Sequence, residues 1–172
     1  MPVRSRLNNP EKKTQLALAD FRSLAELRHQ IRRFLHFSEE AARNSGLEPR
    51  QHQLMLALKG LPEGVRPRVG ELAERLQIQH HSAVELVNRL ASGGYVCRLP
   101  GEQDRREVLV SLTSKGEKIL RGLSIHHKAE LRIRGPALIA ALERAMYPHG
   151  STHLEIRNAK GKEKRNDGDA RN

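Results

Sequence analysis

Residues 68–116 read RVGELAERLQIQHHSAVELVNRLASGGYVCRLPGEQDRREVLVSLTSKG. In the first half of this stretch, apolar residues recur at spacings of three and four, which is typical of amphipathic helices. Near its end, apolar and polar residues alternate, which is typical of a half-buried strand. The stretch therefore predicts a short helix, a tight turn, a second helix and two strands joined by a loop. That order is the layout of a winged helix-turn-helix.

The two predicted helices each have one apolar face. The face of the first helix consists of Val69, Leu72, Ala73 and Leu76, and that of the second consists of Ala83, Leu86, Val87 and Leu90. Ile78 lies in the turn, where it is expected to fill the gap between the helices. The pair Gly93–Gly94 is expected to end the second helix, because glycine readily adopts the backbone conformation that follows many helices.

Two strands are expected after this helix pair, at Tyr95–Leu99 and Glu107–Leu112. The second strand has apolar residues at every other position, which predicts one buried face. The loop between the strands begins with a Pro-Gly turn and continues with Asp104, Arg105 and Arg106. This loop is the tip of the predicted wing.

The segments on either side of this stretch also predict helices. A long helix is expected over about residues 16–45, and another begins near Pro49, which suits a first helical position. A helical region is expected over about residues 113–147, with Thr113 as its N-cap and a break at Gly135–Pro136.

The two ends of the chain are polar. Residues 1–15 are expected to form a flexible arm and residues 149–172 a disordered basic tail, since neither can bury much apolar surface. The prediction is thus a single domain at residues 16–148, mainly α with a small β-wing. Its winged helix covers about residues 47–113.

The composition favours a polyanionic partner. There are 31 Lys and Arg against 20 Asp and Glu, a net charge of +11, and contacts with phosphates release counterions. A ribosome-associated factor is an open alternative, because charge alone does not distinguish the two. Aromatic residues are few, which argues against the base stacking of single-strand binders. The single cysteine and the lack of a signal sequence or long apolar run predict a cytoplasmic protein without a membrane span.

The polar side of the second helix can read base edges. Its candidate DNA-binding residues are His80, His81, Ser82, Val84, Glu85, Asn88 and Arg89. Glu85 can accept from a cytosine amino group, and His81 and Asn88 can bond to purine edges. Val84 can contact a thymine methyl group. The alternative is an ordinary solvated helix face, and the glycine pair and the wing favour entry into a major groove.

The wing carries three candidate DNA contacts, which are Arg98, Arg105 and Arg106. Their charges suit phosphates or a narrow minor groove. Asp104 is expected instead to hold the shape of the loop by pairing with an arginine.

With these residues in view, the chain resembles the MarR family of bacterial transcriptional regulators over roughly residues 16–146. The resemblance is carried by VGELAERL, AVELVNRLASGGYV and DRREVLVSLTSKG, above all by an Asp-x-Arg followed by a strand and Leu-Thr-x-x-Gly. It implies that Asp104 and Arg106 form a structural pair, which leaves Arg105 as the minor-groove contact.

The resemblance also implies a homodimer built from the helices at about 16–45 and 113–147, bound to a near-palindromic operator. Family members often repress transcription and release DNA when a small, frequently aromatic acid binds. Arg68 and Gln79 stand where the family commonly has helix-capping Ser or Thr, and Arg68 is a candidate phosphate contact instead. The His80–His81 pair also departs from the family pattern, so operator preference does not carry over.

Other features favour simple interpretations. Nine histidines, among them His29, His36 and the pair His126–His127, form no compact ligand cluster, so no metal is predicted and zinc sensing is the alternative. Cys97 is interpreted as a plain strand cysteine, with a redox switch as the alternative. No catalytic motif is present, so neither enzymatic activity nor a cofactor is expected.

The sequence therefore predicts a double-stranded DNA-binding transcriptional regulator, specifically a homodimeric repressor released by a small-molecule effector. The effector-binding residues are not defined by the sequence. The alternative function is a basic winged-helix interaction or ribosome-associated protein without a specific operator.

Overall fold

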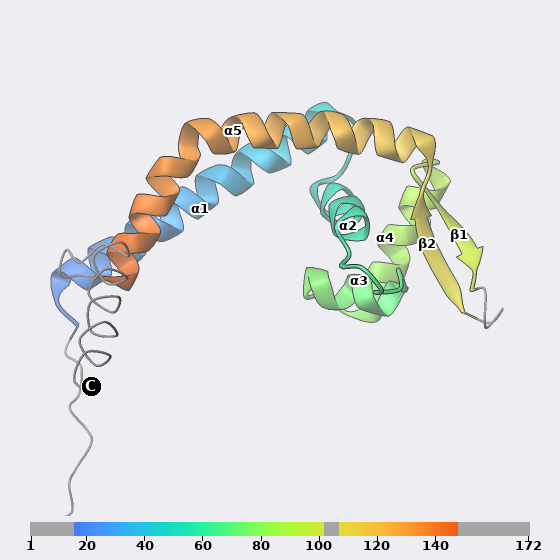
Figure 1. The fold of residues 1–172 in the computed structure, drawn as a ribbon, viewed down its shortest axis with the longest axis horizontal. Coiled ribbons are helices and arrows are strands. Elements are labelled where there is room, and N and C mark those ends of the chain that lie inside the picture. The colour runs from blue at the N-terminus through green and yellow to red at the C-terminus, as the bar shows by residue number, and fades with distance from the viewer. Residues whose placement is uncertain (1–15, 102–106, 148–172) are drawn as a thin grey trace, which may run out of the picture. The chain divides into compact units, whose positions relative to one another are not determined.

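The computed structural model describes residues 16–101 and 107–147 (Figure 1). Its elements in chain order are α1 (Leu18–Asn44), α2 (Pro49–Lys59), α3 (Val69–Leu76), α4 (His80–Ser92), β1 (Val96–Pro100), β2 (Val108–Leu112) and α5 (Ser114–Met146). The predicted class, mainly helical with a small two-stranded wing, is confirmed. The predicted arm at 1–15 and tail at 149–172 lie outside the described residues.

The described residues divide into two compact units, and α1 and α5 run through both. One unit comprises residues 16–31 and 136–147, and the other comprises residues 32–135. The second unit contains α2, α3, α4 and both strands. Within the described ranges, no helix has the length and apolar character needed to cross a lipid bilayer.

The core of the second unit is built from the predicted apolar faces. All four apolar residues predicted for α4 are buried, as are Leu72 and Ala73 of α3. Ile78 packs against this core from the turn between the two helices, as expected. Burial of apolar side chains is the main favourable term in folding, so this packing positions α4 and leaves its opposite side in solvent.

The starts of α3 and α4 lack side-chain caps, as the sequence implied. Arg68 and Gln79 occupy the N-cap positions, and neither side chain accepts a hydrogen bond from its helix. Their backbone carbonyls still accept the first helical bonds, from Leu72 and Ala83, at 3.1 Å each. Since both donors belong to buried core residues, apolar packing holds these helix starts without the usual caps.

The wing is an antiparallel ribbon in which Val96 pairs with Leu112 and Pro100 pairs with Val108. Each strand begins one residue later than predicted. The ribbon is also tied to the loop before α3, because the Val110 N–H donates to the Pro67 carbonyl at 2.9 Å. Val110 is buried while Val108 is 46% exposed. The buried face expected for the whole strand is therefore confined to its half nearest the core.

Helix α5 begins where it was predicted to begin. The Gly116 N–H donates to the Thr113 hydroxyl at 3.1 Å, which confirms Thr113 as the N-cap. The predicted break at Gly135–Pro136 is wrong, because α5 continues through Pro136 to Met146. A proline removes only one helical donor. Pro136 and the neighbouring residues 131–134 and 137 are exposed, and the nearest buried residue is Ala141, a little more than one turn beyond the proline.

Candidate nucleic-acid interface

The predicted base-reading side of α4 faces solvent. His80, His81, Glu85, Asn88 and Arg89 are exposed, whereas Ser82 and Val84 are half-buried at its edge. The fully buried Ala83, Val87 and Leu90 hold the other side of the helix against the core. A helix fixed in this way has little freedom to rotate, so its exposed side chains form a defined surface. Their contacts with bases stay a prediction.

Asn88 and Arg98 form a contact between helix α4 and the wing. The Arg98 guanidinium donates to the Asn88 side-chain carbonyl, and both residues are exposed. An arginine that is partly restrained loses less conformational freedom when it binds a phosphate. Asn88 therefore orients Arg98 in the unbound protein, in addition to its predicted role at a base edge.

Arg68 has a protein partner. Its guanidinium pairs with Glu107, whose other carboxylate oxygen lies 2.7 Å from the Arg66 guanidinium. The Glu107 side chain is only 9% exposed, while that of Arg68 is 57% exposed. Sequence reasoning placed Glu107 on the polar side of its strand and missed this cluster. Arg68 is thus held beside the base of the wing, and its predicted phosphate contact is untested.

The tip of the wing, residues 102–106, lies outside the described residues. The three predicted wing residues Asp104, Arg105 and Arg106 all belong to it, so their roles stay predictions. Cys97 is half-buried on β1 and forms no disulfide. Among residues 16–101 and 107–147, no three His, Cys, Asp or Glu side chains are arranged to hold a metal ion.

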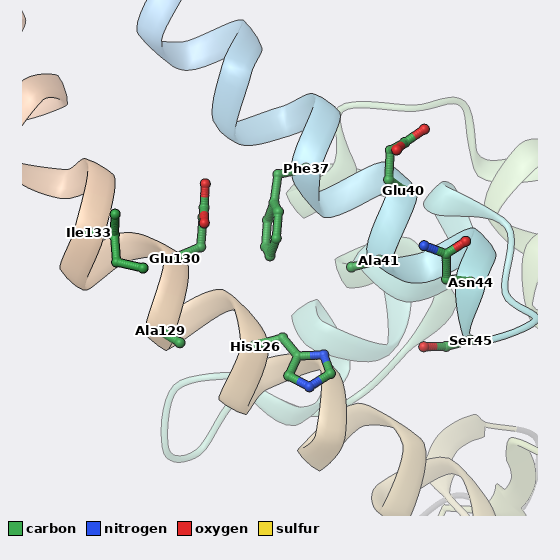
Figure 2. A pocket seen from close by; sticks show the side chains of 9 residues that line it. All are labelled: Phe37, Glu40, Ala41, Asn44, Ser45, His126, Ala129, Glu130 and Ile133. Carbon is green, nitrogen blue, oxygen red and sulfur yellow. The ribbon is translucent and has the colours of Figure 1, made fainter.

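A cavity of about 600 Å³ lies between the C-terminal part of α1 and the middle of α5, within the second unit. Its lining residues are Phe37, Glu40, Ala41, Asn44, Ser45, His126, Ala129, Glu130 and Ile133. Figure 2 shows Phe37 extending from α1 toward α5 and the Glu130 carboxylate extending from α5 toward α1, beside the phenyl ring. Glu130 also pairs with Arg134, one helical turn further along α5. The cavity thus combines an aromatic face with a carboxylate.

Known transcriptional regulators are similar to this chain in sequence. The sequence model of the MarR family matches residues 45–107. The chain is 36% identical over 67 residues to an uncharacterized HTH-type transcriptional regulator of Bacillus subtilis, covering 39% of this chain and 41% of the relative. It is 29% identical over 92 residues to the transcriptional activatory protein BadR of Rhodopseudomonas palustris, covering 53% of each. The matches thus span about half or less of these relatives.

The fold is also similar to that of solved structures. AbsC, a MarR family transcriptional regulator from Streptomyces coelicolor, superposes with a TM-score of 0.62 at 23% identity, covering 78% of this chain and 93% of AbsC. At 23% identity, this likeness shows that the two folds are similar and does not extend to function. Together with the matched sequence, it shows that residues 45–107 are similar to the winged helix-turn-helix of MarR family regulators, as the predicted resemblance implied.

Proposed function

We propose that this chain binds duplex DNA sequence-specifically and regulates transcription. The observation that carries the proposal is the exposed polar side of α4, with Arg98 of the wing held beside it by Asn88. An α-helix fits the major groove, and the net charge of +11 favours the approach to phosphates. A structural neighbour at 16% identity with a TM-score of 0.51, MepR of S. aureus, was solved bound to an oligodeoxyribonucleotide. We also propose that the chain acts in the cytoplasm, where a bacterial regulator meets its DNA.

The candidate residues of α4 and the wing fall into two groups, those that can contact base edges and those that can contact the DNA backbone or the minor groove. His81 and Glu85 present hydrogen-bonding groups at the middle of the exposed side, so we assign them to base edges. Arg98, Arg105 and Arg106 are assigned to the DNA backbone and the minor groove, where charge rather than donor pattern determines affinity.

The regulator is proposed to act as a homodimer, because both candidate dimerisation helices leave large apolar side chains exposed. In the unit formed by 16–31 and 136–147 these are Leu16, Leu18, Phe21, Leu24, Ile31, Ile139, Leu142 and Met146. An exposed apolar surface of this extent is typical of a protein–protein interface. Two-fold symmetry would then place the two copies of α4 about 34–36 Å apart, in successive major grooves of a near-palindromic site.

The sign of regulation is proposed to be repression, as the resemblance to the MarR family implies. BadR, by its name, is an activatory protein, so the sign has to be measured in this chain itself. A transcriptional reporter driven by the bound site provides that measurement. Reporter output that rises when the protein is removed supports repression, and output that falls supports activation.

Release by a small-molecule effector is proposed to use the cavity between α1 and α5. A solved neighbour at 20% identity with a TM-score of 0.53, CouR of Rhodococcus jostii, was crystallised with p-coumaroyl-CoA. In this chain, the cavity is lined by two carboxylates, Glu40 and Glu130, of which Glu130 already pairs with Arg134, so a free carboxylate would add a further negative charge. We therefore favour a neutral or cationic aromatic ligand over the aromatic acid that the resemblance implies.

Thermal-shift titration with a matched pair of ligands tests this preference. Benzylamine and benzoate have similar rings and opposite charges, and a ligand that prefers the folded state raises its melting temperature. We expect the amine series to give the larger shift, and Glu130→Gln to reduce the difference between the two series. A larger shift with benzoate would instead support an aromatic acid as the effector.

Selection of bound duplexes from a random pool tests the proposed function. We expect enrichment of an inverted repeat whose half-sites lie about one helical turn apart. Retention of all sequences with equal affinity would instead support the alternative, a basic winged-helix interaction or ribosome-associated protein without a specific operator.

A further inference from the structure

Three helices of the second unit meet at a pair of stacked histidines. His52, on α2, is 2% exposed, and its ring stacks on that of His127, on α5, with 4.9 Å between ring centroids. Phe34 and Phe37 of α1 contact the His127 ring edge-on, at centroid distances of 6.1 and 5.7 Å.

The two imidazoles differ in their hydrogen bonds. His127 Nδ1 lies 2.6 Å from the Leu123 carbonyl, which can only accept, so this nitrogen carries the hydrogen. His127 Nε2 lies 2.7 Å from the Ser38 hydroxyl of α1. His52 Nε2, in contrast, is buried without a hydrogen-bond partner. His127 is therefore held from both sides, and His52 is a buried polar group without compensation at Nε2.

The pair resists protonation at His52. Burial, followed by the charge on His127, lowers the pKa of His52 from 6.5 to about 4. From α5, His127 is the one titratable group in the described residues whose charge acts on His52, and the α1 residues at the stack are Phe34, Phe37 and Ser38, which do not titrate in this range. A protonated His52 would be a buried cation with no acceptor at Nε2, so it favours any conformation that exposes it.

We propose that the His52–His127 stack is a proton-responsive connection between α2, the first helix of the winged-helix segment, and the candidate dimerisation helices α1 and α5. Protonation of His52 opens the stack and thereby lowers the affinity for DNA. This inference rests on the proposed function: α2 packs against α3 and α4, so we assign DNA binding to the closed arrangement that holds α2 in place. A proton shifts the equilibrium only to the extent that the two arrangements bind it differently, and burial supplies that difference.

The expected direction follows from the lowered pKa. Because the unfolded or open state binds a proton near pH 6.5 and the folded, closed state near pH 4, stability is complete above pH 6.5 and declines as pH falls toward 4. Between pH 7.5 and pH 5, these two values shift the closed-to-open equilibrium by roughly 30-fold. The loss of DNA affinity can reach but not exceed that factor.

The test compares the wild-type protein with His52→Phe, which keeps an aromatic ring against His127 and removes the titrating group. Fluorescence anisotropy with the selected duplex is measured from pH 7.5 to pH 5 at constant salt. The two proteins carry the same exposed residues on α4, so any effect of pH on the DNA-facing side is common to both and cancels in the comparison. We expect wild-type affinity to fall relative to the variant, by up to about 30-fold.

The outcomes separate this inference from the proposed function. Wild-type protein that binds no duplex at pH 7.5 overturns the proposed function and, with it, the DNA-linked part of the inference. Wild-type protein that binds, but with the same pH dependence as His52→Phe, overturns the inference alone. If His52→Phe does not fold, NMR titration of the ring protons of wild-type His52 replaces it. A midpoint near 6.5 contradicts a closed, buried stack, and a midpoint near 4 supports it.

Discussion

At the scale of single residues, the candidate interface depends on what each polar side chain already contacts. Asn88 accepts a hydrogen bond from Arg98, and Glu107 holds both Arg66 and Arg68. Arg98 is exposed, and its partner Asn88 is neutral. Arg98 therefore loses no ion pair when it leaves Asn88 to bind a phosphate. Arg68 would have to leave a carboxylate that is largely buried. Arg98 is therefore a stronger candidate for a DNA contact than Arg68.

Removal of a phosphate-binding arginine should weaken binding to all sequences alike. We expect Arg98→Ala and Arg105→Ala to lower the affinity for every duplex and to reduce the slope of log K against log salt by about 1 each. Binding titrations at several salt concentrations measure both quantities. Arg22→Ala removes an exposed charge on α1, outside the winged-helix segment, and should leave the slope unchanged. An unaltered slope in Arg105→Ala would remove that residue from the interface.

Removal of a base-reading side chain should have a different effect. We expect Glu85→Ala to reduce discrimination at one base pair of each half-site by about 1–3 kcal/mol while leaving the salt slope unchanged. Competition between the selected duplex and its single-base variants measures this. Unchanged discrimination at every position would show that Glu85 is an ordinary solvated residue.

At the scale of elements, the wing and α5 meet at a glycine. Among the described glycines, Gly116 has the closest neighbouring backbone. Gly116 is buried in the first turn of α5, and a Cβ added there would lie 2.0 Å from the Tyr95 backbone carbonyl. Thr113 reinforces the junction, because its hydroxyl donates to the Gly94 carbonyl at 2.7 Å. The Leu-Thr-x-x-Gly motif thus joins the start of α5 to the end of α4 and the beginning of the wing.

Substitution of this glycine should therefore destabilise the fold. We expect Gly116→Ala to lower the free energy of unfolding by about 2 kcal/mol or more, because the obstacle is backbone and cannot rotate away. Urea denaturation followed by circular dichroism measures it. The matched control is Gly122→Ala in the same helix, where the added Cβ meets nothing within 4 Å, and which should stabilise by about 0.5–1 kcal/mol. Equal effects at the two positions would contradict the close approach.

At the scale of the whole molecule, α1 and α5 expose large apolar side chains to water. A single copy leaves side chains such as Phe21 and Ile139 more than half exposed. Burying them in a homodimer would remove apolar surface from water and would present two copies of α4 to one operator.

A charge introduced into this apolar surface should dissociate the dimer. We expect wild-type protein to sediment at twice the chain mass of 19.5 kDa, and Ile139→Asp to shift it toward the monomer. An unpaired buried carboxylate costs about 2–4 kcal/mol, which raises the dimer dissociation constant roughly 30- to 1000-fold. Leu56→Asp is the control, since Leu56 is similarly exposed but lies on α2. A monomeric wild type, or equal effects of the two substitutions, would contradict the proposed interface.

The sequence by itself determined the features whose causes are local. The spacing of Ala83, Leu86, Val87 and Leu90 was sufficient to orient α4, because a helix of fixed pitch puts its apolar side in the core. Thr113 was recognisable as a cap, since a cap involves only the next three residues. The misjudged break at Pro136 shows the limit of this reasoning, because the local penalty of one proline does not end a helix of 33 residues.

Only the tertiary structure decided which side chains meet across elements. The Asn88–Arg98 contact, the pairing of Glu107 with two arginines and the His52–His127 stack each join residues from different segments. No periodicity along the chain encodes such meetings, because they depend on how helices and strands pack in three dimensions. Burial then changes the chemistry of the residues that meet, as it does for His52, whose lowered pKa arises from surroundings supplied by other helices.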